Sequence, residues 1–331
     1  MSLPKKAVLL GIDTSNYTTS AALSQPDCGQ VSGGVLIKQE KKPLPVKEGE
    51  RGLRQSDALF AHTVNLPAVL DALFSGLDFE PELVGVGYSA RPRDLDGSYM
   101  PCFLAGEAAA RGIAASHGIP SFRFSHQAGH IAAAAYSAGE ACFSGSPFLA
   151  FHLSGGTTDL LYVEPEDCTY RITPLGTSLD LHAGQVVDRV GVMLGLRFPC
   201  GPALETLAAS DTGPLPVPKI CVRGCDCNLS GLENIAAKML SDGCKPEMIA
   251  AFTFSFLEKT VGKMTENALL LHPGLPVLYA GGVMSNRLMR AYLSSLCSAS
   301  FAEPAFSADN AAGISLLACR AYHKQTATET L

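Results

Sequence analysis

Two histidines in this chain have the spacing of a metal-binding pair. His126 and His130 lie four residues apart in the segment HQAGH, and a helix presents positions i and i+4 on one face. Imidazole is a common ligand of divalent transition metals, so the pair could chelate one cation. The alternative is two surface histidines with this spacing by chance. Gln127 stands where the H-E-x-x-H motif of metalloproteases has its glutamate, which argues against peptidase chemistry.

Asp309 is a candidate third ligand for the same cation. It comes shortly after Ser307, near the start of the last predicted helix, and carboxylate oxygens often join imidazoles in metal sites. Its other possible role is to stabilise the helix N-terminus, where negative side chains are favourable. The metal role therefore depends on whether folding brings Asp309 beside the two histidines.

Two glycine-rich turns have the composition of an anion-binding site. In Ser154-Gly155-Gly156-Thr157-Thr158, the glycines leave backbone N–H groups accessible and the hydroxyls add donors. The pair Gly281-Gly282 precedes a predicted helix, and helix N-termini bind phosphate. Either turn alone is also an ordinary tight turn. Two of them at matching places predict a nucleotide cleft.

A helix predicted over 183–195 carries an acid on its polar face. Its apolar stripe consists of Ala183, Val186, Val187, Val190, Met193 and Leu194. Asp188 lies on the opposite face, either as a solvent-exposed acid or as a carboxylate that holds ligand hydroxyls. Gly201 follows Phe198-Pro199-Cys200 and would let a ligand approach the backbone closely.

The elements that must position these residues fall into two similar series. Each series reads strand, strand, strand, helix, strand, helix, strand, helix, and the polar turns at Asp13-Thr14-Ser15 and 154–156 occupy equivalent places. The first series is predicted at 7–14, 20–24, 34–38, 56–74, 83–89, 103–116, 120–124 and from 126. The second is predicted at 148–153, 160–163, 170–173, 183–195, 247–270, 276–280, from 285, near 301 and from 309, with two helices, 183–195 and 247–270, where the first series has one.

This duplication predicts an α/β fold of two lobes. Three hairpin-linked strands followed by alternating helices give a mixed sheet covered by helices, and an internal repeat gives two of them. We place the lobes at 1–145 and 146–331, with a Gly-, Pro- and Cys-rich insertion at about 202–247. The basic stretch 38–54 is predicted to be a surface loop that could contact phosphates.

Composition and charge exclude several classes of protein. Of the 331 residues, 47% are hydrophobic and 17% charged, against about 25% charged on average, which excludes a disordered chain. The net charge of -6 supplies no general field for binding a polyanion. No apolar run reaches the ~18 residues of a membrane span, and no secretory signal precedes the first strand. We expect a soluble, cytoplasmic protein without membrane contact.

The eleven cysteines point to reduced thiols. Their odd number and scattered positions are not typical of a disulfide framework. Cys221, Cys225 and Cys227, with Cys200 upstream, have the spacing C-x3-C-x-C rather than the paired C-x2-C of zinc ribbons. We interpret them as structural thiols.

Seven motifs follow one another along the chain: GIDTS at 11–15, HQAGH at 126–130, LSGGTTD at 153–159, DRVGVMLGLRFPCGP at 188–202, LSGL at 229–232, AGGVMSNRLMR at 280–290 and ADNAA at 308–312. With these motifs, the chain resembles the TsaD/Gcp family from about residue 7 to 322. This family was once called O-sialoglycoprotein endopeptidase, a glycoprotease of the M22 type, and has counterparts in the KEOPS complex. The resemblance implies the actin/hexokinase/Hsp70-like (ASKHA) fold, with two RNase H-like lobes around a nucleotide cleft.

The resemblance also implies a metal site. His126, His130 and Asp309 match the family's metal ligands. His152 falls where archaeal members have a metal-binding tyrosine, so it is either a fourth ligand or a core histidine of its strand. The implied cofactor is one divalent metal, iron or zinc.

The nucleotide site is implied in the same way. Ser154 to Thr158 match the family's adenylate-phosphate loop, and Asp188, Gly201 and Asn286 match contacts to the nucleotide sugar and base. With Gly281 and Gly282, these residues would hold threonylcarbamoyl-AMP, AMP or ATP.

The chain departs from the family in places near the acceptor side. After GIDTS the family usually carries acidic residues, whereas this chain has Asn16, Tyr17, Thr18 and Thr19. Arg91-Pro92-Arg93 replaces a G-P-G segment. Because the metal and nucleotide residues are kept, these changes indicate a divergent member or paralogue.

The resemblance implies an acyltransferase that acts on tRNA. The reaction would move threonylcarbamoyl from threonylcarbamoyl-AMP to N6 of adenosine 37 in tRNAs that read ANN codons, with TsaB-like and TsaE-like subunits assisting tRNA binding. One alternative is a paralogous carbamoyl or acyl transferase with another acceptor. A second alternative is a non-catalytic nucleotide-binding scaffold subunit, against which the retained histidine pair argues.

Overall fold

The computed structural model describes residues 3–15, 17–27, 33–45, 53–139, 143, 145–307 and 311–329. The chain forms two compact units: unit 1 contains 1–145, 165–171 and 305–331, and unit 2 contains 146–164 and 172–304. The sequence-based division at 145/146 differs from this partition because the last helix packs on strands of unit 1. A short piece around the turn between two strands, 165–171, also belongs to unit 1.

Unit 1 is built on a mixed sheet of five strands in the order β3-β2-β1-β4-β5. The first three strands form an antiparallel meander, and β1, β4 and β5 run parallel. The carboxyl ends of the three parallel strands therefore meet at one edge, where α/β proteins place their sites. The strands are β1 (Lys5–Ser15), β2 (Thr18–Pro26), β3 (Gly34–Pro43), β4 (Glu80–Arg91) and β5 (Ser121–Ser125).

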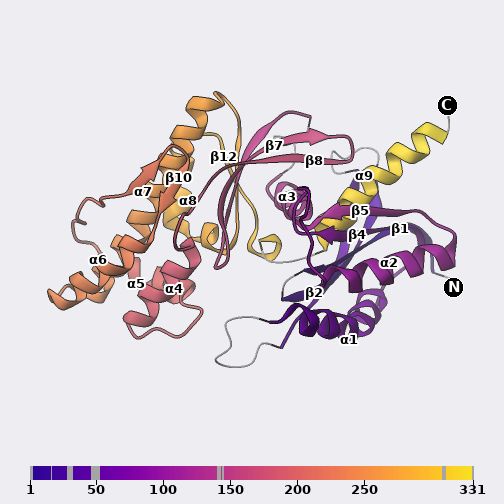
Figure 1. The fold of residues 1–331 in the computed structure, drawn as a ribbon, viewed down its shortest axis with the longest axis horizontal. Helices are drawn as coiled ribbons and strands as arrows, with labels where there is room; N and C mark the ends of the chain where they lie inside the picture. The colour runs from indigo at the N-terminus through magenta and orange to yellow at the C-terminus, as the bar shows by residue number, and fades with distance from the viewer. Residues whose placement is uncertain are drawn as a thin grey trace. The chain divides into compact units, whose positions relative to one another are not determined.

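Four helices cover the two faces of this sheet. They are α1 (Gln55–Phe74), α2 (Phe103–His117), α3 (His126–Ser137) and α9 (Ala312–Glu329). In Figure 1, α1 and α2 lie on one face, and α3 and α9 on the other. Alternation along β1 explains this arrangement, because Val8, Leu10 and Ile12 pack into the core beneath α1 and α2.

The α3–α9 contact is unusually close. A Cβ added to Gly313 of α9 would come within 1.8 Å of the carbonyl oxygen of Gly129 in α3. Only glycine permits this backbone approach. The close contact seats α3, which carries the histidine pair, firmly against α9.

Unit 2 repeats the sheet topology of unit 1. Its strand order is β8-β7-β6-β11-β12, with β6 and β7 antiparallel and with β6, β11 and β12 parallel. The duplicated α/β architecture predicted from the sequence is thereby confirmed. The strands are β6 (Phe148–Leu153), β7 (Thr158–Glu166), β8 (Thr169–Thr177), β11 (Val277–Ala280) and β12 (Ala299–Phe301).

The helices of unit 2 pack around one long apolar helix, α7. It supplies buried residues such as Phe252, Phe256 and Leu257 to a core shared with β6 and α4. The helices are α4 (Ala183–Met193), α5 (Gly201–Ala208), α6 (Ser230–Ser241), α7 (Pro246–Leu271) and α8 (Arg287–Ser294), with 3-10 turns at η2 (Gly282–Ser285) and η3 (Pro304–Phe306). The predicted insertion at 202–247 contains α5, α6 and a hairpin of β9 (Cys221–Arg223) and β10 (Asp226–Asn228).

Two local predictions were wrong. Asp13, Thr14 and Ser15 are the last residues of β1 rather than a turn, because they pair with Ser20, Thr19 and Thr18 of β2. The stretch 38–54 is not a loop throughout: 38–43 completes β3, paired with β2, while 46–52 lies outside the described residues. Within the part of the chain that the structure describes, no helix is long and apolar enough to cross a bilayer.

Candidate functional site

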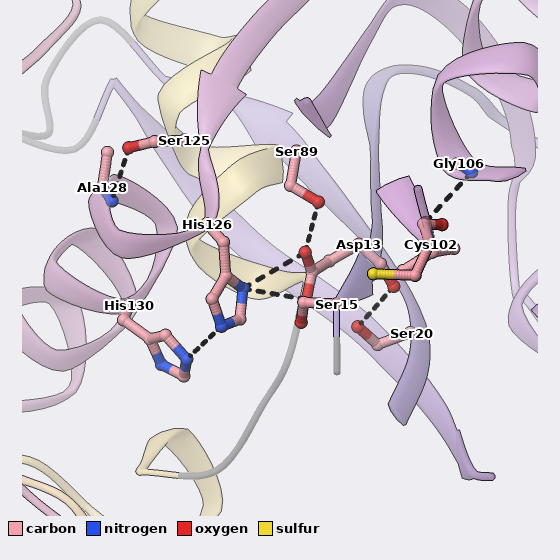
Figure 2. A network of polar contacts seen from close by, with 11 residues as sticks. Asp13, Ser15, Ser20, Ser89, Cys102, Gly106, Ser125, His126, Ala128 and His130 are labelled. Carbon is pink, nitrogen blue, oxygen red and sulfur yellow. Dashed lines mark hydrogen bonds and ion pairs between the residues drawn. The ribbon is translucent and has the colours of Figure 1, made fainter. Parts of the chain in front are cut away.

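Asp13 is a charged residue at the centre of unit 1. It has 0% exposed surface at the carboxyl end of β1. Strand alternation separates it from Thr14, whose hydroxyl donates to the Cys102 carbonyl (3.0 Å) and accepts from the Gly106 N–H (3.1 Å) on the α2 side. Asp13 is thereby aimed at the opposite side, toward α3 (Figure 2).

The Asp13 carboxylate accepts three hydrogen bonds. Ser15 Oγ donates to Oδ2 at 2.6 Å, Ser89 Oγ donates to Oδ1, and His126 Nδ1 lies 3.2–3.3 Å from both oxygens. Burial alone would raise the pKa of Asp13. The charge of His126 and the hydrogen bonds from His126, Ser15 and Ser89 outweigh burial, so the pKa lies below its usual value. Asp13 is therefore an ionised acceptor inside the protein.

This acceptor fixes the tautomer of His126. Because ionised Asp13 has no proton to donate, His126 carries a proton on Nδ1, and its Nε2 offers a lone pair whenever the ring is neutral. His126 Nε2 lies 2.8 Å from His130 Nε2, and the two rings are at 77° with centroids 4.2 Å apart. Figure 2 shows the two Nε2 atoms facing one another.

The donor set fits a divalent cation. Two imidazole nitrogens from one helix face lie within hydrogen-bond distance of each other, and a buried carboxylate holds the His126 ring at its other nitrogen. Carboxylate–histidine pairs of this kind orient the imidazoles of metal sites and raise their basicity. Helical spacing, predicted from the sequence, accounts for the convergence; the supporting role of Asp13 was not predicted. Asp13 was a candidate site residue only as part of the polar turn Asp13-Thr14-Ser15 and of the GIDTS motif.

The other two predicted ligands, Asp309 and His152, remain predictions. Asp309 lies outside the described residues, so its role stays a prediction. His152 lies in β6 of unit 2, opposite Asp159 of β7. Among the described residues, no set of three His, Cys, Asp or Glu side chains is placed to hold a metal ion.

In unit 2, the 154–158 loop is folded against the start of α4. Gly184 N donates to Ser154 O at 3.0 Å, and Ala183 N donates to Thr158 Oγ1 at 2.8 Å. A Cβ on Gly184 would lie 2.6 Å from Gly155 N, so this helix position needs glycine. Gly155 and Gly156 are exposed and have open space around their Cα atoms. The loop therefore presents its backbone outward.

Asn286 of unit 2 is a buried side chain whose two polar atoms have different environments. It is 5% exposed and caps α8, with Oδ1 accepting from Met289 N at 3.0 Å. Its Nδ2 is buried and has no hydrogen-bond partner among the described residues. A buried donor without a partner is costly, and a ligand acceptor would satisfy it.

Two glycines bring Asn286 and the loop to the same strand ends. Gly281 has φ 97°, and a Cβ there would lie 2.1 Å from the Leu153 carbonyl oxygen at the end of β6. Gly282 opens η2 and has open space around its Cα atom. The turn 281–286 and the 154–158 loop thus start from the neighbouring parallel strands β11 and β6.

Asp188 is neither free nor fully exposed. It is half-buried on α4, and its Oδ1 accepts from Cys200 N at 2.8 Å, which ties α4 to the residue before Gly201. Gly201 begins α5 with open space around it. Glu205 of α5 accepts from Arg287 N at 2.8 Å, so α5 is also tied to the 281–286 turn and α8. The predicted apolar stripe is confirmed for Ala183, Val186, Val187 and Val190, which are buried, while Met193 and Leu194 are half-buried.

Two cysteines of the β9–β10 hairpin are held as protonated thiols. Cys225 and Cys227 are buried and free. Burial raises the pKa of Cys225, and raises that of Cys227 to about 12. A thiolate is the form that binds metals, so these values agree with structural thiols.

Comparison with known proteins gives one family across most of the chain. The sequence model described as "TsaD: tRNA N6-adenosine threonylcarbamoyltransferase" matches residues 44–316. A curated protein of that name from Thermus thermophilus is 30% identical over 322 residues, covering 96% of this chain and 93% of its own. A protein of the same name from Pyrobaculum calidifontis is 27% identical over 330 residues, covering 97% and 90%.

Solved structures of other families share the fold. HypF from T. kodakarensis superposes with a TM-score of 0.54 and 13% identity over 99% of this chain and 48% of its own. A ROK family protein from Streptococcus pneumoniae, in complex with sucrose, superposes with a TM-score of 0.51 and 10% sequence identity. The match covers 97% of this chain and 99% of the ROK protein. At these identities the likeness concerns the fold alone, and it agrees with the predicted ASKHA architecture.

Proposed function

This chain belongs to the TsaD family and is an acyltransferase of tRNA modification, and we propose that it transfers threonylcarbamoyl from threonylcarbamoyl-AMP to N6 of adenosine 37 in tRNA, in a metal-dependent reaction. The observation that carries the metal dependence is the convergence of His126 and His130 beside buried Asp13. A cation bound by the pair would take the place of the hydrogen bond between the two Nε2 atoms, and Asp13 would keep the His126 ring in its present orientation.

The pair would hold one iron or zinc ion, with Asp309 as a third ligand and His152 as a candidate fourth. Bound there, the cation would act as a Lewis acid toward carbonyl or phosphate oxygens of the mixed anhydride. Asp13 keeps the His126 lone pair on Nε2, and Ser15 and Ser89 hold the Asp13 carboxylate in place. These residues act together as the support of the ligand pair.

The adenylate would bind to unit 2. Backbone N–H groups of the 154–158 loop would bind its phosphate and stabilise the charge that develops on the leaving AMP. The unpartnered Asn286 Nδ2 would donate to the nucleoside. Asp188 Oδ1 is used by Cys200 N, so Oδ2 is the oxygen offered to a ribose hydroxyl.

The acceptor amine would be activated mainly by positioning. Asp13 is a poor general base because three donors already stabilise its ionised form. Alignment of the amine with the activated carbonyl supplies a large part of the rate in reactions of this kind.

Protein partners would assist tRNA binding. The net charge of -6 predicts weak affinity of the isolated chain for tRNA, which TsaB-like and TsaE-like subunits would remedy. The adjacent helices α1 and α2 expose Phe60 (72%), Val64 (58%) and Leu104 (43%), and this apolar face would suit a TsaB-like subunit. A tRNA substrate would put the enzyme in the cytoplasm.

The test is production of the modified nucleoside. The chain, with its partner subunits, is incubated with threonylcarbamoyl-AMP and an unmodified transcript of an ANN-decoding tRNA, which is then digested and analysed by mass spectrometry. We expect N6-threonylcarbamoyladenosine, and none when adenosine 37 is replaced by guanosine. Absence of the product, where a Thermus thermophilus relative forms it under the same conditions, would contradict the proposal.

That negative result would favour the second candidate, a carbamoyl or acyl transferase with another acceptor. The observation in its favour is the departure at Tyr17, Thr18 and Arg91-Pro92-Arg93 from the family's pattern. A third candidate, a scaffold subunit without catalysis, would bind the adenylate but no metal.

A further inference from the structure

The segment that follows β4 contains an ion pair that reaches the start of α3. Arg91 Nε and Nη2 donate to Asp94 Oδ1 at 3.0 and 2.7 Å. The other oxygen, Asp94 Oδ2, accepts from Ser125 Oγ at 2.5 Å. Asp94 thus connects a strand end of the sheet to the residue that precedes the histidine helix.

Ser125 is the N-cap of α3. Its Oγ accepts from Ala128 N at 3.1 Å, while its proton goes to Asp94. The hydroxyl is therefore held in one orientation, donating on one side and accepting on the other. N-cap hydroxyls satisfy one of the four N–H groups that a helix start leaves without partners.

The same segment satisfies a second of these groups. Gln127 N donates to the Pro92 carbonyl at 3.0 Å. Two N–H groups in the first turn of α3 are accordingly fixed by residues 91–94, one directly and one through Ser125. His126 lies between the two fixed residues, Ser125 and Gln127, and His130 follows one turn later on the same face.

We propose that Asp94 is a positioning residue of the metal site: by holding the first turn of α3, it sets the orientation of the His126 and His130 rings. This inference rests on the proposed metal role of the pair. It also explains the departure from the family pattern at Arg91-Pro92-Arg93. Arg91 orients the Asp94 carboxylate, and the Pro92 carbonyl accepts the Gln127 N–H. Asp13 holds His126 from the sheet side, and Asp94 holds the helix from its N-terminus.

A role in positioning differs from a role in stability. The Arg91 and Asp94 side chains are 37% and 32% exposed, and exposed ion pairs contribute little to the free energy of unfolding. The orientation of metal ligands is more sensitive, since loss of a supporting contact typically weakens metal binding about 10–100-fold.

The experiment is a cobalt titration of the metal-free full-length protein, followed by visible absorbance and by competition with zinc. The variants are Asp94→Ala, Asp94→Asn and, as a matched control, Asp96→Ala, an exposed acid of the same segment. We expect Asp94→Ala to weaken cobalt and zinc binding about tenfold and to change the cobalt spectrum. Asp94→Asn keeps an acceptor for Ser125 and should recover part of the affinity, and Asp96→Ala should match the unaltered protein.

The melting temperature of each metal-free variant is measured alongside. If Asp94→Ala has a much lower melting temperature than the unaltered protein, the inference is judged on the metal affinity of Asp94→Asn. That variant preserves an acceptor for the Ser125 hydroxyl. Unaltered affinity and spectrum in both Asp94 variants, or an equal loss in Asp96→Ala, would overturn the inference while leaving the metal site intact. Failure of the unaltered protein to bind cobalt or zinc would instead refute the proposed metal role, and the inference with it.

Discussion

The two units end their first hairpins differently although their sheets have the same strand order. In unit 1, β1 and β2 pair as far as Ser15 and Thr18, and the polar groups near the strand end are the buried side chains Asp13 and Ser15. In unit 2, β6 and β7 pair only as far as Leu153 and Thr158, and the connecting residues 154–157 expose glycine backbone. The strand ends of unit 1 therefore present polar side chains, and those of unit 2 present exposed main chain.

This difference matches two kinds of ligand. Imidazole lone pairs, supported by a carboxylate, suit a cation. Backbone N–H groups at a turn, together with an unpartnered amide donor, suit an anionic nucleotide. The duplication provides one scaffold twice, and under the proposed function the residues at the equivalent strand ends would bind a metal in unit 1 and an adenylate in unit 2. The following substitutions test this division, from the largest expected effect to the smallest.

Among single substitutions outside the histidine pair, Asp13→Asn should have the strongest effect on unit 1. Asparagine can turn its NH₂ group toward His126 Nδ1, which would move the ring proton to Nε2 and remove the lone pair from the metal side. We expect metal affinity to fall about 10–100-fold, as for other supporting residues, with AMP binding unchanged. Zinc and AMP titrations by calorimetry measure both. Equal zinc affinity in the variant would remove Asp13 from the metal site.

In unit 2, two glycines that lie next to each other in space, Gly155 and Gly184, should respond differently to substitution by alanine. Gly184→Ala places a Cβ 2.6 Å from Gly155 N and should destabilise the protein by about 1–3 kcal/mol. Gly155→Ala has open space, so it should leave stability nearly unchanged and weaken AMP binding alone. Urea unfolding and AMP titration separate these outcomes. A stability loss in Gly155→Ala as large as that in Gly184→Ala would contradict this description of the loop.

These two glycines also illustrate what can and cannot be predicted from a sequence. The periodicity of β6, α4 and α7 located those elements to within a few residues, and the i, i+4 spacing of His126 and His130 predicted their shared face. The alternation of the strands did not reveal that Asp13 contacts His126 or that Gly184 touches Gly155, because such contacts join residues far apart in the chain. The β9–β10 hairpin was missed since its strands are only three residues each.

The return of α9 to unit 1 was missed for a related reason. Its apolar residues predict a helix but not which sheet it covers, and the deciding contact, Gly313 on Gly129, involves no side chain at all. The hydrogen bond between Asp94 and Ser125 could not be predicted either, because nothing in the sequence indicates that an exposed acid and a serine 31 residues apart are in contact.

A smaller effect should separate the two functions of Asn286. Asn286→Asp keeps the Oδ1 cap of α8 and removes the Nδ2 donor, so stability should be unchanged while AMP binds about tenfold more weakly, the effect of roughly one to two hydrogen bonds. Asn286→Ala should lose both the cap, at about 1 kcal/mol, and the AMP contact. If Asn286→Asp binds AMP as tightly as the unaltered protein, the unpartnered nitrogen does not face the nucleotide.

The smallest effect concerns the acid stability of unit 2. Burial would raise the pKa of Asp180, but hydrogen bonds from Ser230, from the Leu229 and Leu181 N–H groups and from Asn228 hold it well below its usual value. A carboxyl with a lowered folded-state pKa stabilises the protein above its unfolded pKa of about 3.9, and this contribution is lost as the pH falls further.

Asp180→Asn should therefore be less stable than the unaltered protein at pH 7, with a difference that narrows below pH of about 4. Urea unfolding at several pH values measures it, with Asp242→Asn, an exposed acid at the end of α6, as the control. A stability difference that is independent of pH would show that the ionised form of Asp180 contributes nothing special.

The central claim is that unit 1 binds the metal and unit 2 binds the adenylate. It is tested most directly by measuring zinc and AMP binding in one variant, His126→Ala with His130→Ala. Zinc content by elemental analysis and AMP affinity by calorimetry are compared with the unaltered protein and with His117→Ala, an exposed histidine of α2. The double variant should lose its zinc and bind AMP as before. Retention of stoichiometric zinc, or loss of AMP binding together with the metal in a folded protein, would contradict the account.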